Sequence, residues 1–194
     1  MSARVGALQV VARVVGIGLP MAAVGTAMVL GELTPRVAVM VGTCGAYAGS
    51  GVPVGDVVVA RHLRFGTTGV AEGLVQFPEP LSIATTADER LADALGGYGA
   101  RAADVVTTPA VTVDDAAASR LAQAAGAQAE HLEAYGAAIA CAARGIPFTA
   151  VLGVANAVGS RARDEWRANH RQAAAAAAGV VIRWLQGGGR PFWT

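Results

Sequence analysis

The sequence contains no lysine, only two cysteines, and no uninterrupted apolar run of about twenty residues. Every basic side chain is an arginine, which together with the excess of alanine and glycine is typical of a GC-rich coding sequence and carries no information on mechanism. Without a long apolar run, we expect no membrane span. The N-terminus also lacks a basic segment followed by an apolar stretch and a cleavage site, so we expect a cytoplasmic protein.

Charge is sparse as well. The formal net charge is +1 and no basic run occurs, so a nucleic-acid partner is not expected. Arginines gather between residues 161 and 171, but Asp164 and Glu165 interrupt them, and the pattern indicates a solvated helix face. The three histidines lie far apart and have no metal-ligand spacing, so neither a metal nor a cofactor is predicted.

The two cysteines, Cys44 and Cys141, lie in apolar surroundings, one at the end of an expected strand and the other on an expected helix. A free cysteine behaves as a small hydrophobic side chain and is commonly buried. A disulfide is the alternative, but nothing in the sequence indicates an oxidising compartment. We therefore favour two buried free thiols over a bridge.

Apolar β-branched runs alternate with helical patterns along the chain. Nearly continuous apolar strands are typical of a parallel sheet covered on both faces. We therefore predict a single domain over residues 1–194, with a three-layer α/β/α fold around a mixed, largely parallel sheet and a flexible tail at 187–194. The alanine run 173–178 predicts a helix packed closely on its neighbour. The expected strands are 10–15, 37–41, 54–61, 103–108 and 148–154, and the expected helices are 20–30, 88–95, 114–125, 130–144 and 164–185.

A glycine turn, Gly16-Ile17-Gly18, separates the first expected strand from the first expected helix. Such a turn is compatible with a dinucleotide site, but Met21 stands where that fingerprint has its third glycine. Two glycines alone are weak evidence. The sequence therefore does not predict a nicotinamide cofactor.

Glu133 and Asn156 are the residues that point to a particular chemistry. Glu133 lies within an alanine-rich apolar pattern that predicts a helix. Burying a carboxylate costs several kcal/mol unless it accepts hydrogen bonds, so we expect Glu133 to await a ligand, with a surface glutamate as the alternative. Asn156 follows the next expected strand, at the edge where an open α/β sheet holds ligands. The alternative for Asn156 is an asparagine that caps a turn.

Two blocks of sequence resemble the nucleoside phosphorylase/nucleosidase superfamily, which includes purine nucleoside phosphorylases and MTA/SAH nucleosidases. One block joins Leu132-Glu133-Ala134-Tyr135-Gly136-Ala137 to Val154-Ala155-Asn156. The other joins the glycine turn of 39–46, VMVGTCGA, to the strand of 54–59, VGDVVV. Residues 156–166 are most similar to the futalosine hydrolase branch, in which Asn is followed by Val-Gly-Pro-Arg and a Trp. The resemblance extends over roughly residues 10–185.

The resemblance implies a site that binds a purine nucleoside. In that site Glu133 would accept hydrogen bonds from both ribose hydroxyls, and Asn156 would donate to N7 or O6 of a 6-oxopurine. Thr43 would assist at the sugar or the nucleophile, although a threonine also fits a strand end. Leu132 would form an apolar floor under the sugar. The remaining residues of the expected binding set are Gly45, Val111 and Val113.

Departures from the family pattern favour hydrolysis over phosphorolysis. Met40 stands where phosphorylases place a phosphate-binding Arg, Leu152 stands at a second common Arg position, and Ala155 replaces a Ser. The chain aligns with the family from its second strand onward, so we also expect it to be shortened at the N-terminus and to lack the carboxylate that activates water in nucleosidases. The hypothesis is a purine nucleoside N-ribosyl hydrolase resembling the futalosine hydrolase of menaquinone biosynthesis, and a homodimer or larger homo-oligomer. The alternatives are a purine nucleoside phosphorylase and a catalytically weakened nucleoside-binding protein.

Overall fold

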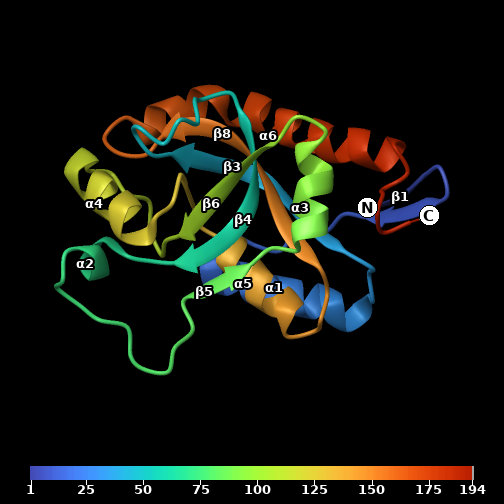
Figure 1. Ribbon diagram of the computed structural model, residues 1–194, viewed down its shortest axis with the longest axis horizontal. Helices are drawn as coiled ribbons and strands as arrows, with labels where there is room; N and C mark the ends of the chain where they lie inside the picture. The colour runs from blue at the N-terminus through green and yellow to red at the C-terminus, as the bar shows by residue number, and fades with distance from the viewer. Residues whose placement is uncertain (194) are drawn as a thin grey trace.

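The computed structural model describes residues 1–193 and has the expected α/β architecture, with helices packed around a central sheet (Figure 1). The sheet has six strands in the order β5-β4-β6-β7-β3-β8, and β4 also pairs with β8. Five of the strands therefore close into a ring, a closure that the sequence analysis did not address. The strands are β3 (Ala38–Ala46), β4 (Val57–Phe65), β5 (Ala84–Thr86), β6 (Arg101–Thr107), β7 (Ala129–His131) and β8 (Phe148–Ala157).

The pairing is mixed, as predicted. The pairs β3–β8, β4–β6 and β6–β7 are parallel, and the pairs β3–β7, β4–β5 and β4–β8 are antiparallel. Strands β3 and β8 run side by side from Ala38 opposite Phe148 to Ala46 opposite Ala157, with one irregularity after Cys44. The carboxyl ends of β3 and β8 therefore lie next to each other.

Helices cover the ring on opposite sides. In Figure 1, α6 lies along β8 and β3, while α1 and α5 lie together on the other side of the sheet. The contact between α1 and α5 is close because a glycine lies within it. A Cβ on Gly136 of α5 would lie 2.6 Å from the carbonyl oxygen of Leu19. The alanine run of α6 packs directly on β8, as predicted. The helices are α1 (Leu19–Glu32), α2 (Thr68–Ala71), α3 (Glu89–Gly96), α4 (Asp115–Ala125), α5 (Ala134–Ala142) and α6 (Ala162–Gln186).

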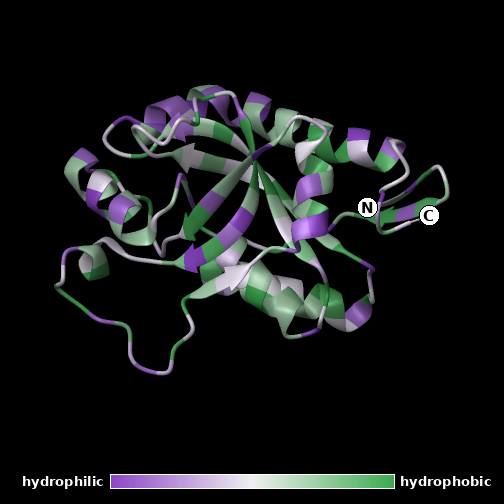
Figure 2. Ribbon diagram, viewed as in Figure 1, coloured by the Kyte–Doolittle hydropathy of each residue, from purple (hydrophilic) through white to green (hydrophobic). Residues whose placement is uncertain are grey.

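Apolar side chains fill the ring and the layer beneath α6. Leu63, Val105 and Leu152 are fully buried in the main cluster, and Trp184 joins Leu91 in a second cluster. Figure 2 shows the central strands mainly in the hydrophobic colour and hydrophilic residues toward both ends of α6. The burial pattern thus matches the nearly continuous apolar strands of the sequence.

Two boundaries predicted from the sequence were wrong in ways that matter. The first expected strand, 10–15, is β2 (Leu8–Val11), which pairs only with β1 (Ser2–Val5) in a separate hairpin, so its hydrogen bonds are satisfied outside the main sheet. The expected helix 130–144 overlaps the last two residues of the three-residue strand β7, which is too short to show a period of two. As a result Glu133 precedes α5 and does not lie within it.

The C-terminal segment and the cysteines complete the packing. Residues 187–193 were expected to be flexible, but the indole Nε1 of Trp184 donates to the carbonyl oxygen of Arg190 at 2.8 Å, and Phe192 and Trp193 pack against the second cluster. Residue 194, the last of that expected tail, lies outside the described residues. Among residues 1–193, none of the helices has both the length and the apolar character that crossing a bilayer requires.

Both cysteines are buried free thiols, as predicted. Cys44 and Cys141 lie in the main apolar cluster, and neither forms a disulfide. Because burial disfavours the thiolate, it raises the pKa of Cys44 to about 12 and that of Cys141 to about 11.

Candidate active site

Glu133 stands at the N-terminus of α5 and has protein partners on both carboxylate oxygens. Its Oε1 accepts a hydrogen bond from the backbone N–H of Gly18 at 2.7 Å, and its Oε2 lies 3.3 Å from Nε2 of His131. The side chain remains 17% exposed. The sequence led us to expect that Glu133 awaits a ligand, and it gave no sign of these two protein partners. A carboxylate has about four acceptor positions, so these two contacts leave capacity for two further donors.

His131 holds Glu133 through a defined tautomer. The ring is buried, and its Nδ1 accepts hydrogen bonds from the backbone N–H groups of Glu133 at 3.1 Å and Ala134 at 2.9 Å. An Nδ1 that accepts cannot carry a proton, so the proton of the neutral ring is on Nε2 and faces Glu133. Burial lowers the pKa of His131, although the negative charge of Glu133 opposes this. The protonated Nε2 of the neutral ring therefore lies 3.3 Å from Oε2 of Glu133.

Glycines bring the turn before α1 to Glu133. Gly16 and Gly18 have φ values of +103° and +79°, a region that residues with a Cβ rarely adopt. Gly136, one turn into α5, allows the first residue of α1 to approach closely. The turn that invited a dinucleotide interpretation thus supplies a backbone donor to a carboxylate.

Asn156 is buried near the end of β8, opposite Gly45. The sequence placed it just past a strand ending at 154, but β8 continues to Ala157, so Asn156 lies within the strand. Its Nδ2 donates to the carbonyl oxygen of Ala157 at 2.8 Å, which leaves the second N–H of the amide for another acceptor. A Cβ on Gly45 would lie 2.8 Å from this Nδ2. Gly45 is therefore required for Asn156 to occupy its position.

Thr43 lies on β3 between Gly42 and Gly45, and its side chain contacts α6. Its Oγ1 accepts a hydrogen bond from Nε1 of Trp166 at 3.2 Å, and the Trp166 ring stacks on His170 with centroids 4.3 Å apart. Sequence reasoning placed Thr43 near the sugar but gave no sign of its contact with Trp166. The threonine hydroxyl still has its own proton to donate.

The glycine turn of β3 connects the two predicted halves of the site. A Cβ built on Gly42 would lie 3.5 Å from Nε2 of His131, whereas Gly45 adjoins the amide of Asn156. Three residues of extended chain span about 10 Å. His131 and Asn156 therefore adjoin two positions of β3 that lie about 10 Å apart along the strand.

Glu130 is a buried carboxylate that the sequence analysis missed. It accepts hydrogen bonds from Tyr47 Oη at 2.9 Å, from the backbone N–H of Thr112 at 3.0 Å and from Thr112 Oγ1 at 2.6 Å. Burial, followed by the charge and hydrogen bond of Glu130, raises the pKa of Tyr47. The only available signal was the proximity of Glu130 to Glu133 in sequence. This cluster fixes the loop that carries Val111 and Val113.

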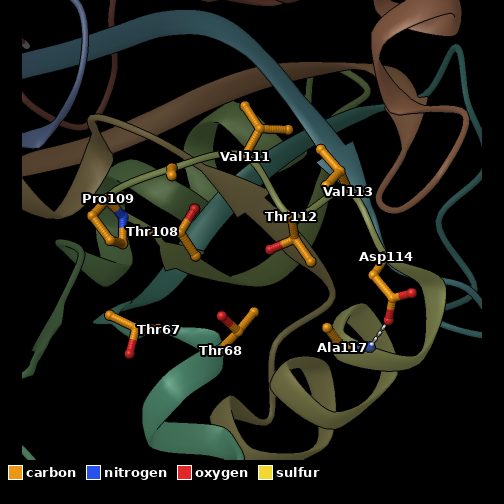
Figure 3. A pocket seen from close by; sticks show the side chains of 10 residues that line it. Thr67, Thr68, Thr108, Pro109, Val111, Thr112, Val113, Asp114 and Ala117 are labelled. Carbon is orange, nitrogen blue, oxygen red and sulfur yellow. Dashed lines mark hydrogen bonds between the residues drawn. The ribbon is translucent and has the colours of Figure 1, made fainter. Parts of the chain in front are cut away.

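Val111 and Val113 line a cavity of about 240 Å³ beside α2 and α4, together with Thr68 and Thr108 (Figure 3). Both valines are exposed, at 52% and 69%. Neither Glu133 nor Asn156 lines this cavity. The structure thus brings Gly45 and Asn156 together, places Thr43 nearby on β3 against Trp166, and places Val111 and Val113 in a separate cavity. Leu132 is partly buried beside Glu133.

Two other polar side chains, His62 and Glu72, form pairs outside the candidate site. His62 Nδ1 lies 2.6 Å from Asp104, and Glu72 pairs with Arg120 at 2.6 Å. Neither pair contains a residue of the predicted site. Among residues 1–193, no group of three His, Cys, Asp or Glu side chains is arranged to hold a metal ion.

Solved structures share this fold at low sequence identity. A 5'-methylthioadenosine/S-adenosylhomocysteine nucleosidase from Neisseria meningitidis, in complex with methylthio-immucillin-A, is 21% identical, with 96% of this chain and 84% of that chain covered and a TM-score of 0.83. The corresponding nucleosidase from Colwellia psychrerythraea, in complex with adenine, is 20% identical over 95% of this chain and 80% of that chain, with a TM-score of 0.83. A futalosine hydrolase mutant of Helicobacter pylori is 13% identical over 96% of this chain and 84% of that chain, with a TM-score of 0.86.

At the level of sequence, no curated protein matches the chain significantly. A family model described as the phosphorylase superfamily matches residues 2–186. This match covers nearly the whole chain and agrees with the fold shared with the solved nucleosidases. The protein therefore belongs to the phosphorylase superfamily.

Proposed function

We propose that the protein is a purine nucleoside N-ribosyl hydrolase that acts on a 6-oxopurine nucleoside, as a futalosine hydrolase does. The observation that carries this proposal is the position of the β3 glycine turn between His131 at one end and Asn156 at the other. The fold shared with solved nucleosidases, one of which is a futalosine hydrolase, adds support.

Glu133 would hold the ribose. Cleavage of an N-glycosidic bond passes through a sugar with the character of an oxocarbenium ion, and a nearby carboxylate stabilises that positive charge. Hydrogen bonds to an ionised acceptor are about twice as strong as those between neutral groups. Because the Gly18 N–H and His131 fix the carboxylate, Glu133 could bind two hydroxyls without reorganising.

Asn156 would bind the departing base. A carboxamide cannot protonate the base, but its free N–H can donate to N7 or O6 of a 6-oxopurine as negative charge develops there. An adenine has an amino group in place of O6, so the same N–H would face a donor. This difference favours hypoxanthine or guanine as the leaving group.

Water is favoured over phosphate as the nucleophile. Met40 packs against the main apolar cluster, and Leu152 is fully buried within it. These are the positions at which the family resemblance would place arginines. Binding of a phosphate dianion is poor without a guanidinium or a comparable cation, so hydrolysis is the reaction that these apolar side chains support.

A homo-oligomer is part of the proposal. The exposed face of α1 and the turn before it carries Ile17, Met21, Val24 and Met28, which are exposed by 84%, 57%, 56% and 65%. No charged side chain occurs between Arg13 and Glu32. An apolar stripe of this kind commonly marks an interaction surface. Light scattering coupled to size exclusion is expected to give a mass of at least two chains, and a mass of one chain would contradict this part.

The test is to incubate the protein with inosine, futalosine and methylthioadenosine, with and without phosphate, and to measure free base and free sugar. We expect hypoxanthine release that does not depend on phosphate. Release only with phosphate would show a phosphorylase, and binding without release would show a nucleoside-binding protein. Glu32→Gln, a change at an exposed glutamate at the C-terminal end of α1, is the control for substitution at Glu133.

A further inference from the structure

Three side chains in the first turns of α6 contact the ends of the two strands that carry Thr43 and Asn156. Glu165 Oε2 accepts a hydrogen bond from the backbone N–H of Ala157 at 2.8 Å, and Asn169 Nδ2 donates to the carbonyl oxygen of Ala155 at 3.0 Å. Trp166, between them in sequence, donates to Thr43. Glu165 and Asn169 are four residues apart, so they lie on the same face of the helix.

The two backbone groups that α6 holds lie on either side of Asn156. The pairing between β3 and β8 shifts at this point, from Cys44 opposite Val154 to Gly45 opposite Asn156. Ala155 is therefore an extra residue that faces no partner on β3. Bulges of this kind occur beside active sites, where they redirect a side chain. Here the bulge immediately precedes Asn156.

The hydrogen bonds from α6 stabilise this bulge. A buried carbonyl without a partner costs about 1–3 kcal/mol, and Asn169 supplies a donor to the carbonyl of Ala155. Glu165 fixes Ala157, whose carbonyl oxygen in turn accepts from the Asn156 carboxamide. The orientation of that carboxamide thus depends on α6 through one intervening residue.

We propose that Glu165 and Asn169 are positioning residues that hold the bulged end of β8, so that the Asn156 carboxamide keeps the orientation that distinguishes a 6-oxopurine from a 6-aminopurine. This inference rests on the proposed function, because it takes Asn156 as the residue that meets the base. It assigns base selectivity to side chains of α6 that contact the backbone of β8.

The experiment compares Asn169→Ala and Glu165→Ala with Arg167→Ala, an exposed change on the same helix. Values of kcat/KM are measured for inosine and adenosine, together with Tm. Displacement of a catalytic group by about 1 Å can cost roughly 100-fold in rate. We expect both alanine variants to lose at least about tenfold in kcat/KM for inosine, and the inosine-to-adenosine ratio to fall. Arg167→Ala should match the wild type.

Glu165→Gln separates positioning from simple destabilisation. A glutamine oxygen can still accept from the N–H of Ala157, so this variant should restore most of the inosine-to-adenosine ratio lost in Glu165→Ala. A purely structural role would lower Tm and reduce turnover of both nucleosides by the same factor, leaving the ratio unchanged. That result would overturn the proposal.

The wild type distinguishes failure of this inference from failure of the proposed function. If the wild type releases no base from inosine, futalosine or adenosine, the proposed function is wrong, and amide hydrogen exchange then decides whether α6 holds the strand end. Faster exchange of the Ala157 amide in Glu165→Ala than in Arg167→Ala would support that hold. Equal protection in the two variants would overturn it.

Discussion

The end of β7 and the start of α5 each present a carboxylate, three residues apart, in opposite environments. Glu130 is buried and receives three hydrogen bonds from Tyr47 and Thr112. Glu133 has one backbone donor and one histidine, and part of its side chain is open. A carboxylate whose protein donors are numerous and buried is a structural connector, whereas one with unused acceptor positions at a partly open surface can bind a ligand. Proximity in sequence does not separate these roles.

The largest expected effect is on catalysis, at the partly exposed carboxylate of Glu133. Glu133→Gln removes the charge that would bind the ribose and stabilise the transition state, while its oxygen can still accept from the Gly18 N–H. We expect kcat/KM for inosine to fall by about 100- to 1,000-fold, or roughly 3–4 kcal/mol, the scale for losing one strong active-site hydrogen-bonding group. Glu32→Gln should have no effect. Activity within about threefold of the wild type would remove Glu133 from the site.

The next largest effect is on stability, at the buried carboxylate of Glu130. Glu130→Ala leaves the Tyr47 hydroxyl and two donors of Thr112 buried without an acceptor. We expect the free energy of unfolding, measured in urea, to fall by about 2–3 kcal/mol. Glu133→Gln, measured in the same way, should change it far less. If the two substitutions destabilise the protein equally, the distinction between the two carboxylates is wrong.

His131 links the two regions and should give stability a pH dependence. Burial lowers its pKa in the folded state below the ordinary value of 6.5, so the unfolded chain binds a proton that the folded protein does not. Stability is therefore retained above pH 6.5 and lost as the pH falls toward the lowered pKa, by up to about 1.4 kcal/mol per pH unit. Urea melts at pH 7.5 and 5.5 should show a smaller drop for His131→Asn than for the wild type. His62→Asn, at a half-exposed histidine, is the control, and equal drops in all three proteins would contradict the assignment.

The smallest expected effect concerns Tyr47, one of the donors to Glu130. Tyr47→Phe removes one hydroxyl that donates to Glu130 but leaves both contacts from Thr112. We expect a loss of about 1 kcal/mol in the free energy of unfolding. Combined with Glu130→Ala, the substitution should cost less than the sum of the single changes, because the two groups interact directly. Strict additivity would mean that the hydrogen bond does not contribute.

Much of the fold could be predicted from the sequence because it depends on local patterns. Apolar runs gave the central strands, and capping residues such as Asp88 and Asp114 accept hydrogen bonds from the first turns of α3 and α4. The strand β7 could not be predicted, because three residues carry no period and their pairing partners, β3 and β6, are distant in sequence. Closure of the sheet through β4 and β8 is likewise a property of the whole chain.

The candidate site was predictable in its residue types but not in its connections. Glu133 and Asn156 were found through motif spacing, and His131, two residues before Glu133, and Asn156 each adjoin a glycine of β3. Their supporting partners, Gly18, Glu165 and Asn169, were missed because each acts through a hydrogen bond between distant segments. The glycine at 18 had been noticed for a different reason, since a positive φ and a cofactor turn require the same residue.

The contact between β8 and α6 has a consequence for anyone wishing to alter the substrate range of this protein. A side chain on Gly153 would collide with the backbone of Ala173, so the backbones of β8 and α6 are in direct contact there. A library that varies Gly153 or the alanines opposite would shift the whole helix, and with it every group near Asn156. Randomisation should leave Gly153 and the alanines opposite unchanged. It should concentrate on the loop that carries the exposed Val111 and Val113, where new side chains can be accommodated without moving α6 or β8.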